Sequence, residues 1–390
     1  MSALRRHRAR RTVQVACAAI ALGLAACGGD GANGANEVDG AAADTASGST
    51  PAVAQNGAQD VAPEPRPAGS APPGMVWIGG GTFTMGSDAD LAWPTEHPAH
   101  RVTVGGFWMD ATEVTNARFA AFVDATGYVT EAERPVDRAE LVAAGVPAEL
   151  ITEADLLPSA LVFETRADAV HAGRVEDFDF TQVWHIRPGA DWRHPEGPWS
   201  SIEDRMDHPV VHVTYADALA FCEWAGCRLP TEPEWECAAR GGLESATYSW
   251  GDEDVLDPVP RANVWQGTFP NDNSLADGFA RTAPVGSFAP NGFGLYDMGG
   301  NVWEWTADWF RSDMNARRAA EAARGPVVDP VGPSDPWNEN SPSERGRVTK
   351  GGSFLCDTEQ CFNYRPSSRM ASEATTPLCH TGFRCVRDPR

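Results

Sequence analysis

The sequence predicts a single α+β domain that is irregular and rich in loops, with short strands and few helices. Three segments begin at a threonine suited to an N-cap and stop at a glycine, which is typical of capped helices. Short β-favouring runs, broken by glycine, come before these segments. After the third segment the chain is dense in Trp, Gly, Asn and Pro, so its regular elements must be short and loops must supply much of the framework.

The predicted strands lie at the start of the domain. Met75–Ser87 combines β-favouring runs with a glycine turn, which is typical of a hairpin. His97–Val104 and Phe107–Asp110 are predicted to form further short strands.

The three helices are predicted from their caps, their apolar spacing and their glycine stops. In the first, Phe119, Phe122 and Val123 share one face. The third has a capping box made by Thr231 and Glu234. The three segments, from cap to stop, are Thr115–Gly127, Thr214–Gly226 and Thr231–Gly241.

The first 73 residues are predicted to lie outside the domain. Five arginines precede an apolar run, Val13–Ala26, which is too short to span a bilayer and ends at Leu-Ala-Ala-Cys27. We therefore expect residues 1–26 to be a lipoprotein signal peptide and Cys27 to carry the lipid; an ordinary signal peptide cut nearby is the alternative. Residues 27–73, which have almost no large apolar side chains, are expected to be a disordered tether.

This N-terminus predicts an exported protein that is anchored by lipid in the bacterial cell envelope, facing the periplasm or the cell surface. The net charge of −23 disfavours binding to nucleic acid, because an acidic body repels a polyanion. No nucleic-acid partner is therefore expected, the membrane is reached only through the lipid, and we expect a monomer.

Cys356 and Cys361 form a candidate metal site. They stand five positions apart, shortly after Gly351-Gly352, and the flexible glycines let the backbone bend so that both sulfurs reach one point. Thiolate pairs suit soft ions such as Cu(I) or Zn(II). In an exported protein the alternative is a disulfide, or two half-cystines with other partners.

Several short blocks are specific enough to indicate a family. Through them the chain from Gly74 to Asp388 resembles the formylglycine-generating enzymes, also called sulfatase-modifying factors, and residues 74–390 are assigned to one such domain with a C-type-lectin-like fold. Two features point to the catalytic branch, namely the block at 192–198 and the pair Cys356/Cys361. The matching blocks are Met75–Ser87, Glu113–Asn116, Gly127–Glu133, Asp191–Pro198, His208–Val213, Arg228–Glu232, Asn301–Trp305 and Gly351–Ser353.

The resemblance implies a copper-dependent oxidase that uses O2 to convert a cysteine of an unfolded sulfatase, within Cys-x-Pro-x-Arg, to Cα-formylglycine. It implies that Cys356 and Cys361 bind Cu(I) and that the substrate cysteine joins as a third sulfur. Ser353 matches a serine beside the oxygen pocket, and Trp303 matches a tryptophan that lines it. The alternatives are a turn hydroxyl for Ser353 and a core aromatic for Trp303.

The resemblance also implies two calcium ions and one disulfide. Oxygen atoms from carboxylates, amides and the backbone are the ligands that a hard cation requires. Cys222 and Cys385 match a family disulfide, whereas the pairing of Cys227, Cys237 and Cys379 stays open. The implied calcium ligands are Asn263, Val264, Asp277 and Phe279 for one ion, and Asp297, Gly300, Val302 and Glu304 for the other.

Two other functions are compatible with such a fold. One is a non-catalytic binding or structural lipoprotein, and the other is different oxidative chemistry, such as sulfoxide or pyoverdine-type maturation. Neither would need both Cys356 and Cys361, so their presence favours the formylglycine-generating activity.

Overall fold

The computed structural model describes residues 60–143, 145–171, 183–256, 258–342, 345–358 and 361–389. The predicted signal peptide, the predicted lipidation site Cys27 and residues 27–59 of the predicted tether lie outside these ranges. Residues 61–64 run along the start of the domain: the backbone nitrogen of Glu64 donates to the Gly79 carbonyl at 2.6 Å, and that of Val61 donates to Thr82 Oγ1 at 2.8 Å. Within the described ranges, every helix is too short or too polar to cross a bilayer.

Two small sheets contain the first four strands. One has the order β1-β4-β12 and the other the order β2-β3-β8. The strands at the predicted positions are confirmed, but the hairpin within Met75–Ser87 is wrong, because β1 pairs with β4 and β2 pairs with β3. The bounds are Met75–Ile78 (β1), Gly81–Met85 (β2), His100–Val104 (β3), Phe107–Asp110 (β4), Val327–Val328 (β8) and Val386–Arg387 (β12).

The glycine turn between β1 and β2 explains this difference. Gly80 has φ +64°, and a Cβ there would lie 2.3 Å from the Val104 carbonyl oxygen. The turn therefore packs directly against the β3–β4 connection. It passes the chain from one sheet to the other instead of folding it back on itself.

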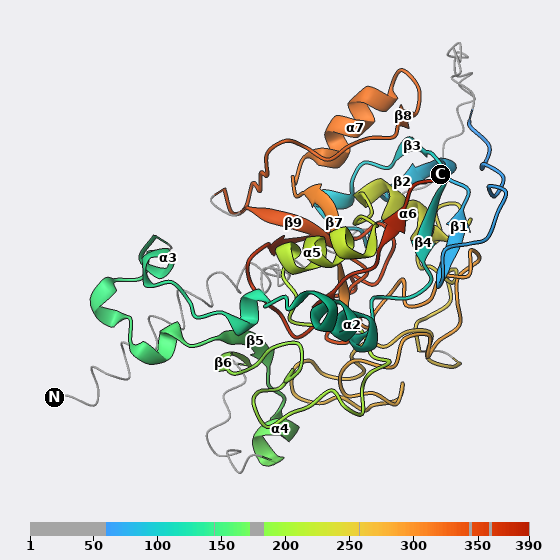
Figure 1. Ribbon diagram of the computed structural model, residues 1–390. Coiled ribbons are helices and arrows are strands. Elements are labelled where there is room, and N and C mark those ends of the chain that lie inside the picture. The colour runs from blue at the N-terminus through green and yellow to red at the C-terminus, as the bar shows by residue number, and fades with distance from the viewer. Residues whose placement is uncertain are drawn as a thin grey trace, which may run out of the picture.

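A third sheet, β10-β9-β7-β11, lies at the centre of the molecule (Figure 1). Its middle strand β7 holds the Trp-Glu-Trp block, pairs antiparallel with β9 and pairs parallel with β11. The sequence predicted mainly loops in this half of the chain, so these strands are an addition. The bounds are Trp303–Trp309 (β7), Gly346–Lys350 (β9), Met370–Glu373 (β10) and Thr381–Gly382 (β11).

The three predicted helices are confirmed. Each has its threonine cap, Thr115, Thr214 or Thr231, accepting from a backbone nitrogen in the first turn, and each ends at a glycine in the left-handed region. The last of the three packs against strands β2, β3, β7 and β9 and so joins two sheets. The helices are α2 (Asn116–Thr126), α5 (Tyr215–Ala225) and α6 (Glu232–Arg240).

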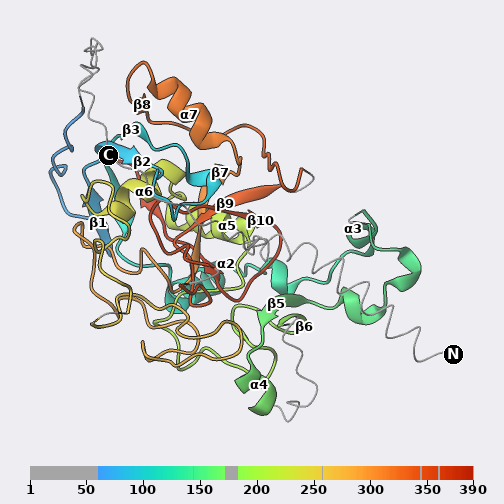
Figure 2. The ribbon, with the colours of Figure 1, turned by 180° about the vertical axis from the view of Figure 1, so that it is seen from behind.

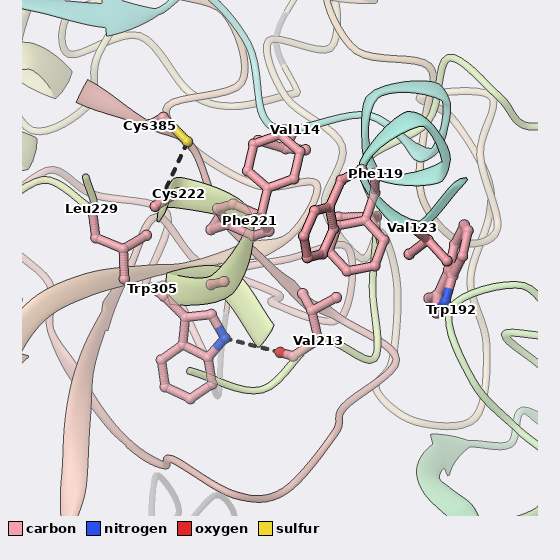
Figure 3. Close-up of a cluster of buried hydrophobic side chains, with 14 of the residues drawn as sticks. Val114, Phe119, Val123, Trp192, Val213, Phe221, Cys222, Leu229, Trp305 and Cys385 are labelled. Atoms are coloured by element: carbon pink, nitrogen blue, oxygen red, sulfur yellow. Dashed lines mark hydrogen bonds between the residues drawn. The ribbon is translucent and has the colours of Figure 1, made fainter. Parts of the chain in front are cut away.

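A buried aromatic cluster joins α2 and α5 to the central sheet (Figure 3). Phe119 of α2 stacks on Phe221 of α5 at 6.0 Å and meets Trp192 edge-on at 5.1 Å. Trp305 of β7 reaches the same cluster, and its Nε1 donates to the Val213 carbonyl at 3.0 Å. The block at residues 192–198 thus contributes a core tryptophan, Trp192.

The last residues of the chain close this core. The Phe383 carbonyl accepts from the Val114 nitrogen at 2.9 Å, and the Cys385 carbonyl accepts from the Asp110 nitrogen at 2.9 Å. β11 lies beside β7, while β12 lies beside β4. Residues 381–387 therefore join two sheets that are built from distant parts of the sequence.

Part of the segment between α2 and α5 forms a peripheral unit. Figures 1 and 2 both place α3, α4 and the antiparallel pair β5 and β6 to one side of the three sheets. A further helix, α7, packs on β3 and β8. The bounds are Arg138–Ala143 (α3), Ser159–Phe163 (β5), Arg166–His171 (α4), Trp184–Pro188 (β6) and Met314–Ala322 (α7), with 3₁₀ turns at Pro94–Glu96, Glu131–Glu133, Ala148–Leu150 and Glu153–Leu156.

Candidate functional site

The predicted thiol pair lies in the connection between β9 and β10. Gly351 and Gly352 bend the chain with φ of +90° and +70°, and a Cβ on Gly352 would lie 2.9 Å from the Tyr364 nitrogen. Cys356 is buried and Cys361 is partly exposed. A hydrogen bond with the Cys356 thiol, together with burial, raises the pKa of Cys361 well above its usual value. The structure thus brings the two sulfurs together, with Cys361 nearer to solvent.

Trp303 and Ser353, the other two predicted site residues, lie close to this pair. Trp303 belongs to the same buried cluster as Cys356. Cys361, which is partly buried, packs against this cluster. Ser353 is buried, and its Oγ accepts from the Leu355 nitrogen at 3.2 Å, which fixes the turn that leads to Cys356. The Cys356 carbonyl accepts from the Trp265 nitrogen at 2.8 Å, so a residue from another loop also holds the thiol-bearing loop in place.

Two residues that the sequence analysis missed hold Cys361 in place. Asn363 Nδ2 donates to Cys361 Sγ at 3.2 Å, a bond that lowers the pKa of the thiol against the larger effects of Cys356 and burial. Trp93 Nε1 donates to Asn363 Oδ1 at 2.8 Å and so fixes the orientation of the amide. The Trp93 ring also stacks on Phe362 at 5.2 Å. Trp93 precedes Asn363 by 270 positions, so no local pattern could connect them.

The first predicted calcium group is oxygen-rich and compact. Asn263 Oδ1 is buried and has no hydrogen-bond donor among the described residues, while Asn263 Nδ2 donates to the Arg281 carbonyl at 2.8 Å. Asp277 accepts from the nitrogens of Val264 at 3.2 Å and Phe279 at 2.9 Å, and burial raises its pKa. The Val264 carbonyl accepts from the Gln266 side chain. A buried oxygen without a donor, beside a half-buried carboxylate, fits a hard cation.

The second predicted group surrounds the entry to β7. Glu304 accepts from Arg384 through both oxygens at 2.7 Å, and Asp297 accepts from the Gly286 nitrogen at 2.7 Å. The Gly300 nitrogen donates to the Gly351 carbonyl at 2.8 Å, which ties this turn to the thiol-bearing loop. Val302, which stands between Gly300 and Glu304 in the sequence, is buried in the core. The two predicted carboxylates lie near enough for the charge of Glu304 to raise the pKa of Asp297, but Glu304 already has a cationic partner in Arg384.

Glu113 is a third carboxylate in this second group, and the sequence analysis quoted it only as part of a block. Burial, followed by the charge of Asp297, raises the pKa of Glu113 well above its usual value. Burial likewise raises the pKa of Asp297. Glu113 Oε2 is buried without a hydrogen-bond partner in the described ranges. Three carboxylates against one guanidinium leave a surplus of negative charge, which also fits a bound cation.

Comparison with known proteins decides the family. The sequence model of the sulfatase-modifying factor enzyme 1-like domain matches residues 59–389. The chain belongs to the sulfatase-modifying factor family. The resemblance that the sequence blocks indicated is thereby confirmed.

Several curated members of the sulfatase-modifying factor family are close in sequence. The formylglycine-generating enzyme of Thermomonospora curvata is 46% identical over 81% of this chain and 94% of its own length. That of Mycobacterium tuberculosis is 47% identical over 81% of this chain and 98% of its own. The inactive Cα-formylglycine-generating enzyme 2 of Mus musculus is 37% identical, with shares of 80% and 85%.

A solved structure supports the fold of this family member. PvdO from Pseudomonas aeruginosa aligns with a TM-score of 0.53 and 23% identity, covering 81% of this chain and 94% of its own. The predicted fold class, an irregular α+β domain with short strands and few helices, is confirmed.

The structure places the two sulfurs of the predicted disulfide side by side but not at bonding distance. Cys222 Sγ and Cys385 Sγ are neighbours, as the family match implied, but they lie 3.6 Å apart, whereas a disulfide joins sulfurs at about 2.05 Å. The sulfur of Cys227 lies within 4.8 Å of both. All cysteines in the described ranges are free thiols, including Cys237 and Cys379, which lie in separate buried clusters.

Proposed function

We propose that the protein is a formylglycine-generating enzyme that converts the cysteine of a Cys-x-Pro-x-Arg segment, in an unfolded sulfatase, to Cα-formylglycine with O2. The observation that carries this proposal is the paired thiols, Cys356 buried and Cys361 partly exposed, in a chain whose relatives named for this activity are 46% and 47% identical. A buried thiol beside a partly exposed one, packed among aromatic side chains, is suited to receive a third sulfur from a peptide.

Cu(I) is the cofactor that we propose for this pair. Two soft thiolates suit Cu(I), which when bound supplies the one-electron chemistry that activates O2. The protein's own residues position the two thiols and exclude water from them. Asn363 donates to Cys361 Sγ and favours its thiolate form, Trp93 holds that amide, and Trp303 keeps water from the buried sulfur of Cys356. Ser353 fixes the turn that presents the buried thiol.

Calcium is proposed as a structural ion at the two oxygen-rich groups. Asn263 and Asp277, with the carbonyls of Val264 and Phe279, would hold one ion. Asp297 and Glu304, with the carbonyls of Gly300 and Val302, would hold the other. The unpartnered oxygens of Asn263 and Glu113 support this proposal, because a buried oxygen without a donor is costly unless a cation takes its place.

We further propose that the protein is exported, anchored in the bacterial cell envelope by a lipid on Cys27, and active as a monomer. The support is the arginine-rich start, the short apolar run and the Leu-Ala-Ala-Cys sequence of residues 1–27. In this location the enzyme would meet a sulfatase as it leaves the export machinery, before that substrate folds.

The test uses the purified protein loaded with Cu(I) and a synthetic peptide that contains Cys-x-Pro-x-Arg, incubated in air. Mass spectrometry should detect the loss of mass that accompanies the change from thiol to aldehyde. Cys356→Ala and Cys361→Ala should each abolish the conversion, whereas Cys237→Ala, which removes a buried thiol in α6, should leave it unchanged. Absence of conversion by a folded, copper-loaded protein would favour a non-catalytic lipoprotein instead.

A further inference from the structure

Asn301 lies between the two oxygen-rich groups without being one of their predicted ligands. In the sequence it stands between Gly300 and Val302, which are both predicted ligands of the second group. It is buried, with 1% of its surface exposed, and its backbone is in the left-handed region with φ +58°. Asparagine tolerates this conformation better than most residues, so the turn itself favours this residue type.

The side chain of Asn301 connects the two groups. Its Oδ1 accepts from Asn263 Nδ2 of the first group at 3.1 Å, and its Nδ2 donates to Glu113 Oε1 beside the second group at 2.9 Å. The Ala283 nitrogen donates to the same Oδ1 at 2.9 Å, and the Ala283 carbonyl accepts from Nδ2 at 3.5 Å. An amide offers two donor and two acceptor positions, and all four are used here. A buried amide that is fully satisfied is held in one orientation.

The backbone of Asn301 joins the thiol-bearing loop, which begins at Gly351. The Phe354 nitrogen, two residues before Cys356, donates to the Asn301 carbonyl at 2.9 Å. One position earlier, the Gly300 nitrogen donates to the Gly351 carbonyl at 2.8 Å. The second group is thus bonded to this loop at two points.

The first group is bonded to the same loop through Trp265. This residue directly follows Val264, a predicted ligand of the first group. Its backbone nitrogen donates to the carbonyl of Cys356 itself, at 2.8 Å. Both groups therefore reach the segment that carries the buried thiol.

The two groups also pack backbone against backbone. The Asn301 nitrogen donates to the Asn263 carbonyl at 2.8 Å. A Cβ on Gly300 would lie 2.4 Å from the same carbonyl oxygen, so the contact leaves no room for a side chain. A displacement of either group is consequently passed to Asn301 and from there to the thiol-bearing loop.

Cys356 is the thiol that this network holds directly. Cys361 is held mainly by Asn363, whose amide donates to its sulfur at 3.2 Å. The position of the buried thiol should therefore respond more strongly than that of the partly exposed one to events at the oxygen-rich groups.

We propose that Asn301 is a positioning residue, through which cations bound at the two oxygen-rich groups hold Cys356 in its buried place. A cation at the first group fixes Asn263, and a cation at the second offsets the charge of Glu113, so both act on partners of the Asn301 amide. The inference rests on the proposed binding of calcium and is independent of the oxidase activity.

The test measures how often Cys356 becomes accessible. A buried thiol is alkylated only when its surroundings open, so the alkylation rate reports the free energy of that opening. Mildly reduced, copper-free protein is treated with N-ethylmaleimide in calcium or in EGTA, and peptide mapping follows Cys356 and Cys237 separately. Cys237, a buried thiol in α6, reports openings elsewhere in the domain. Calcium should protect Cys356 at least about fivefold more than Cys237, which is the lower end of the usual coupling between linked sites.

Asn301→Gly separates positioning from general stability. Glycine keeps the left-handed turn and its backbone hydrogen bonds but removes the amide that links the groups, so the extra protection of Cys356 should be lost. Asn315→Ala is the matched control. It removes a buried amide of α7, which donates to the Glu96 carbonyl at 2.8 Å, and should keep the extra protection. Circular dichroism checks that both variants are folded.

A reversed pair tests the same link if Asn301→Gly does not fold. Asn301→Asp combined with Glu113→Gln exchanges donor and acceptor across the 2.9 Å contact and leaves the net charge unchanged, so calcium should still give Cys356 its extra protection. The proposal is overturned if calcium protects Cys356 and Cys237 equally in the parent, if folded Asn301→Gly keeps the extra protection, or if the reversed pair abolishes it. Failure of peptide conversion alone would contradict the proposed oxidase and leave these results unchanged.

Discussion

Two buried groups of carboxylates in this protein differ in how their charge is balanced. The first, which we call the balanced cluster, contains Glu232, Glu236 and Asp308 beside Arg240, Arg318, Lys350 and Arg369. The second, which we call the acidic cluster, contains Glu113, Asp297 and Glu304 beside Arg384. Three carboxylates meet four cationic side chains in one cluster and a single one in the other.

The pKa values of Glu232 and Glu113 follow this difference, whereas burial raises the pKa of Asp308, at the edge of the balanced cluster, to about 6. Burial alone would raise the pKa of Glu232, but Arg369, Arg318 and Lys350 lower it far below its usual range. In the acidic cluster burial raises the pKa of Glu113, and Asp297 adds to the effect because it carries the same charge. Two fully buried glutamates thus differ: Glu232 is held charged by its cationic partners, whereas Glu113 lacks a direct one. A buried carboxylate is therefore a sign of a metal site only where protein cations are too few.

The largest effect is expected from breaking the balanced cluster. Arg369→Met removes the two hydrogen bonds to Glu232, at 2.6 Å and 3.0 Å, and leaves Arg318 as the remaining direct partner of that carboxylate. The free energy of unfolding should fall by about 3 kcal/mol, because breaking a buried pair leaves an uncompensated charge. Urea unfolding measures this.

The matched control for that variant is Arg138→Met, which breaks the exposed pair with Glu153. It should change the stability by less than about 1 kcal/mol. Equal losses in the two variants would contradict the importance assigned to the balanced cluster.

Removal of calcium should have the next largest effect. Chelation by EGTA should lower the free energy of unfolding by about 2.7 kcal/mol for each site that was held at 100 times its Kd, and thermal unfolding with and without added calcium measures the difference. Asp277→Asn and Asp297→Asn should each weaken the response to calcium. An identical melting curve in EGTA and in calcium would show that neither oxygen-rich group binds the ion.

A smaller effect is expected from pH in the chelated protein. Because the pKa of Glu113 is raised above its usual 4.5 in the folded state, the folded protein binds the proton more tightly than the unfolded chain does. The resulting stabilisation is fully present below the unfolded pKa and is lost as pH rises through the folded pKa. The melting temperature in EGTA should therefore increase as the pH is lowered from 8 towards 5.

Two controls sharpen the pH prediction. Glu113→Gln should flatten this dependence, since the amide cannot titrate. Saturating calcium should also flatten it, because the ion holds the carboxylates in their charged form. Glu232 behaves with the opposite sign: its lowered pKa contributes stability above about pH 4.5 that is lost on further acidification. A melting temperature that falls steadily from pH 8 to 5 in EGTA would contradict the charge surplus of the acidic cluster.

The features that could be predicted from the sequence are local ones. The caps Thr115, Thr214 and Thr231 and their glycine stops lie within about a dozen residues of each other, so the chain's own spacing determines α2, α5 and α6. The positions of the strands could also be predicted from local patterns, but the partner of each strand could not. Whether β1 pairs with β2 or with β4 depends on the packing of Gly80 against Val104, which no short pattern contains.

The candidate site likewise has a part that local patterns predicted and a part that depends on distant residues. The spacing of Cys356 and Cys361 and the family blocks indicated the thiols, and the structure brings them together beside Trp303. Trp93, Asn363 and the partnership of Glu304 with Arg384 could not be predicted, because they join residues that are 270 and 80 positions apart. The resemblance implied two calcium ions and one disulfide as the stabilising features of the loop-rich half. It did not anticipate the buried ion pairs, such as Glu96 with Arg365.

The segment Thr381–Arg387 affects how quickly the protein can fold. It completes two sheets, and within it Arg384 supplies the guanidinium that neutralises Glu304. Its partners in β4 and β7 stand far from it in the sequence, and contacts between such distant residues are entropically costly to form early. Neither sheet is finished until this segment is in place, so we expect slower folding than for a domain of the same size built from local contacts.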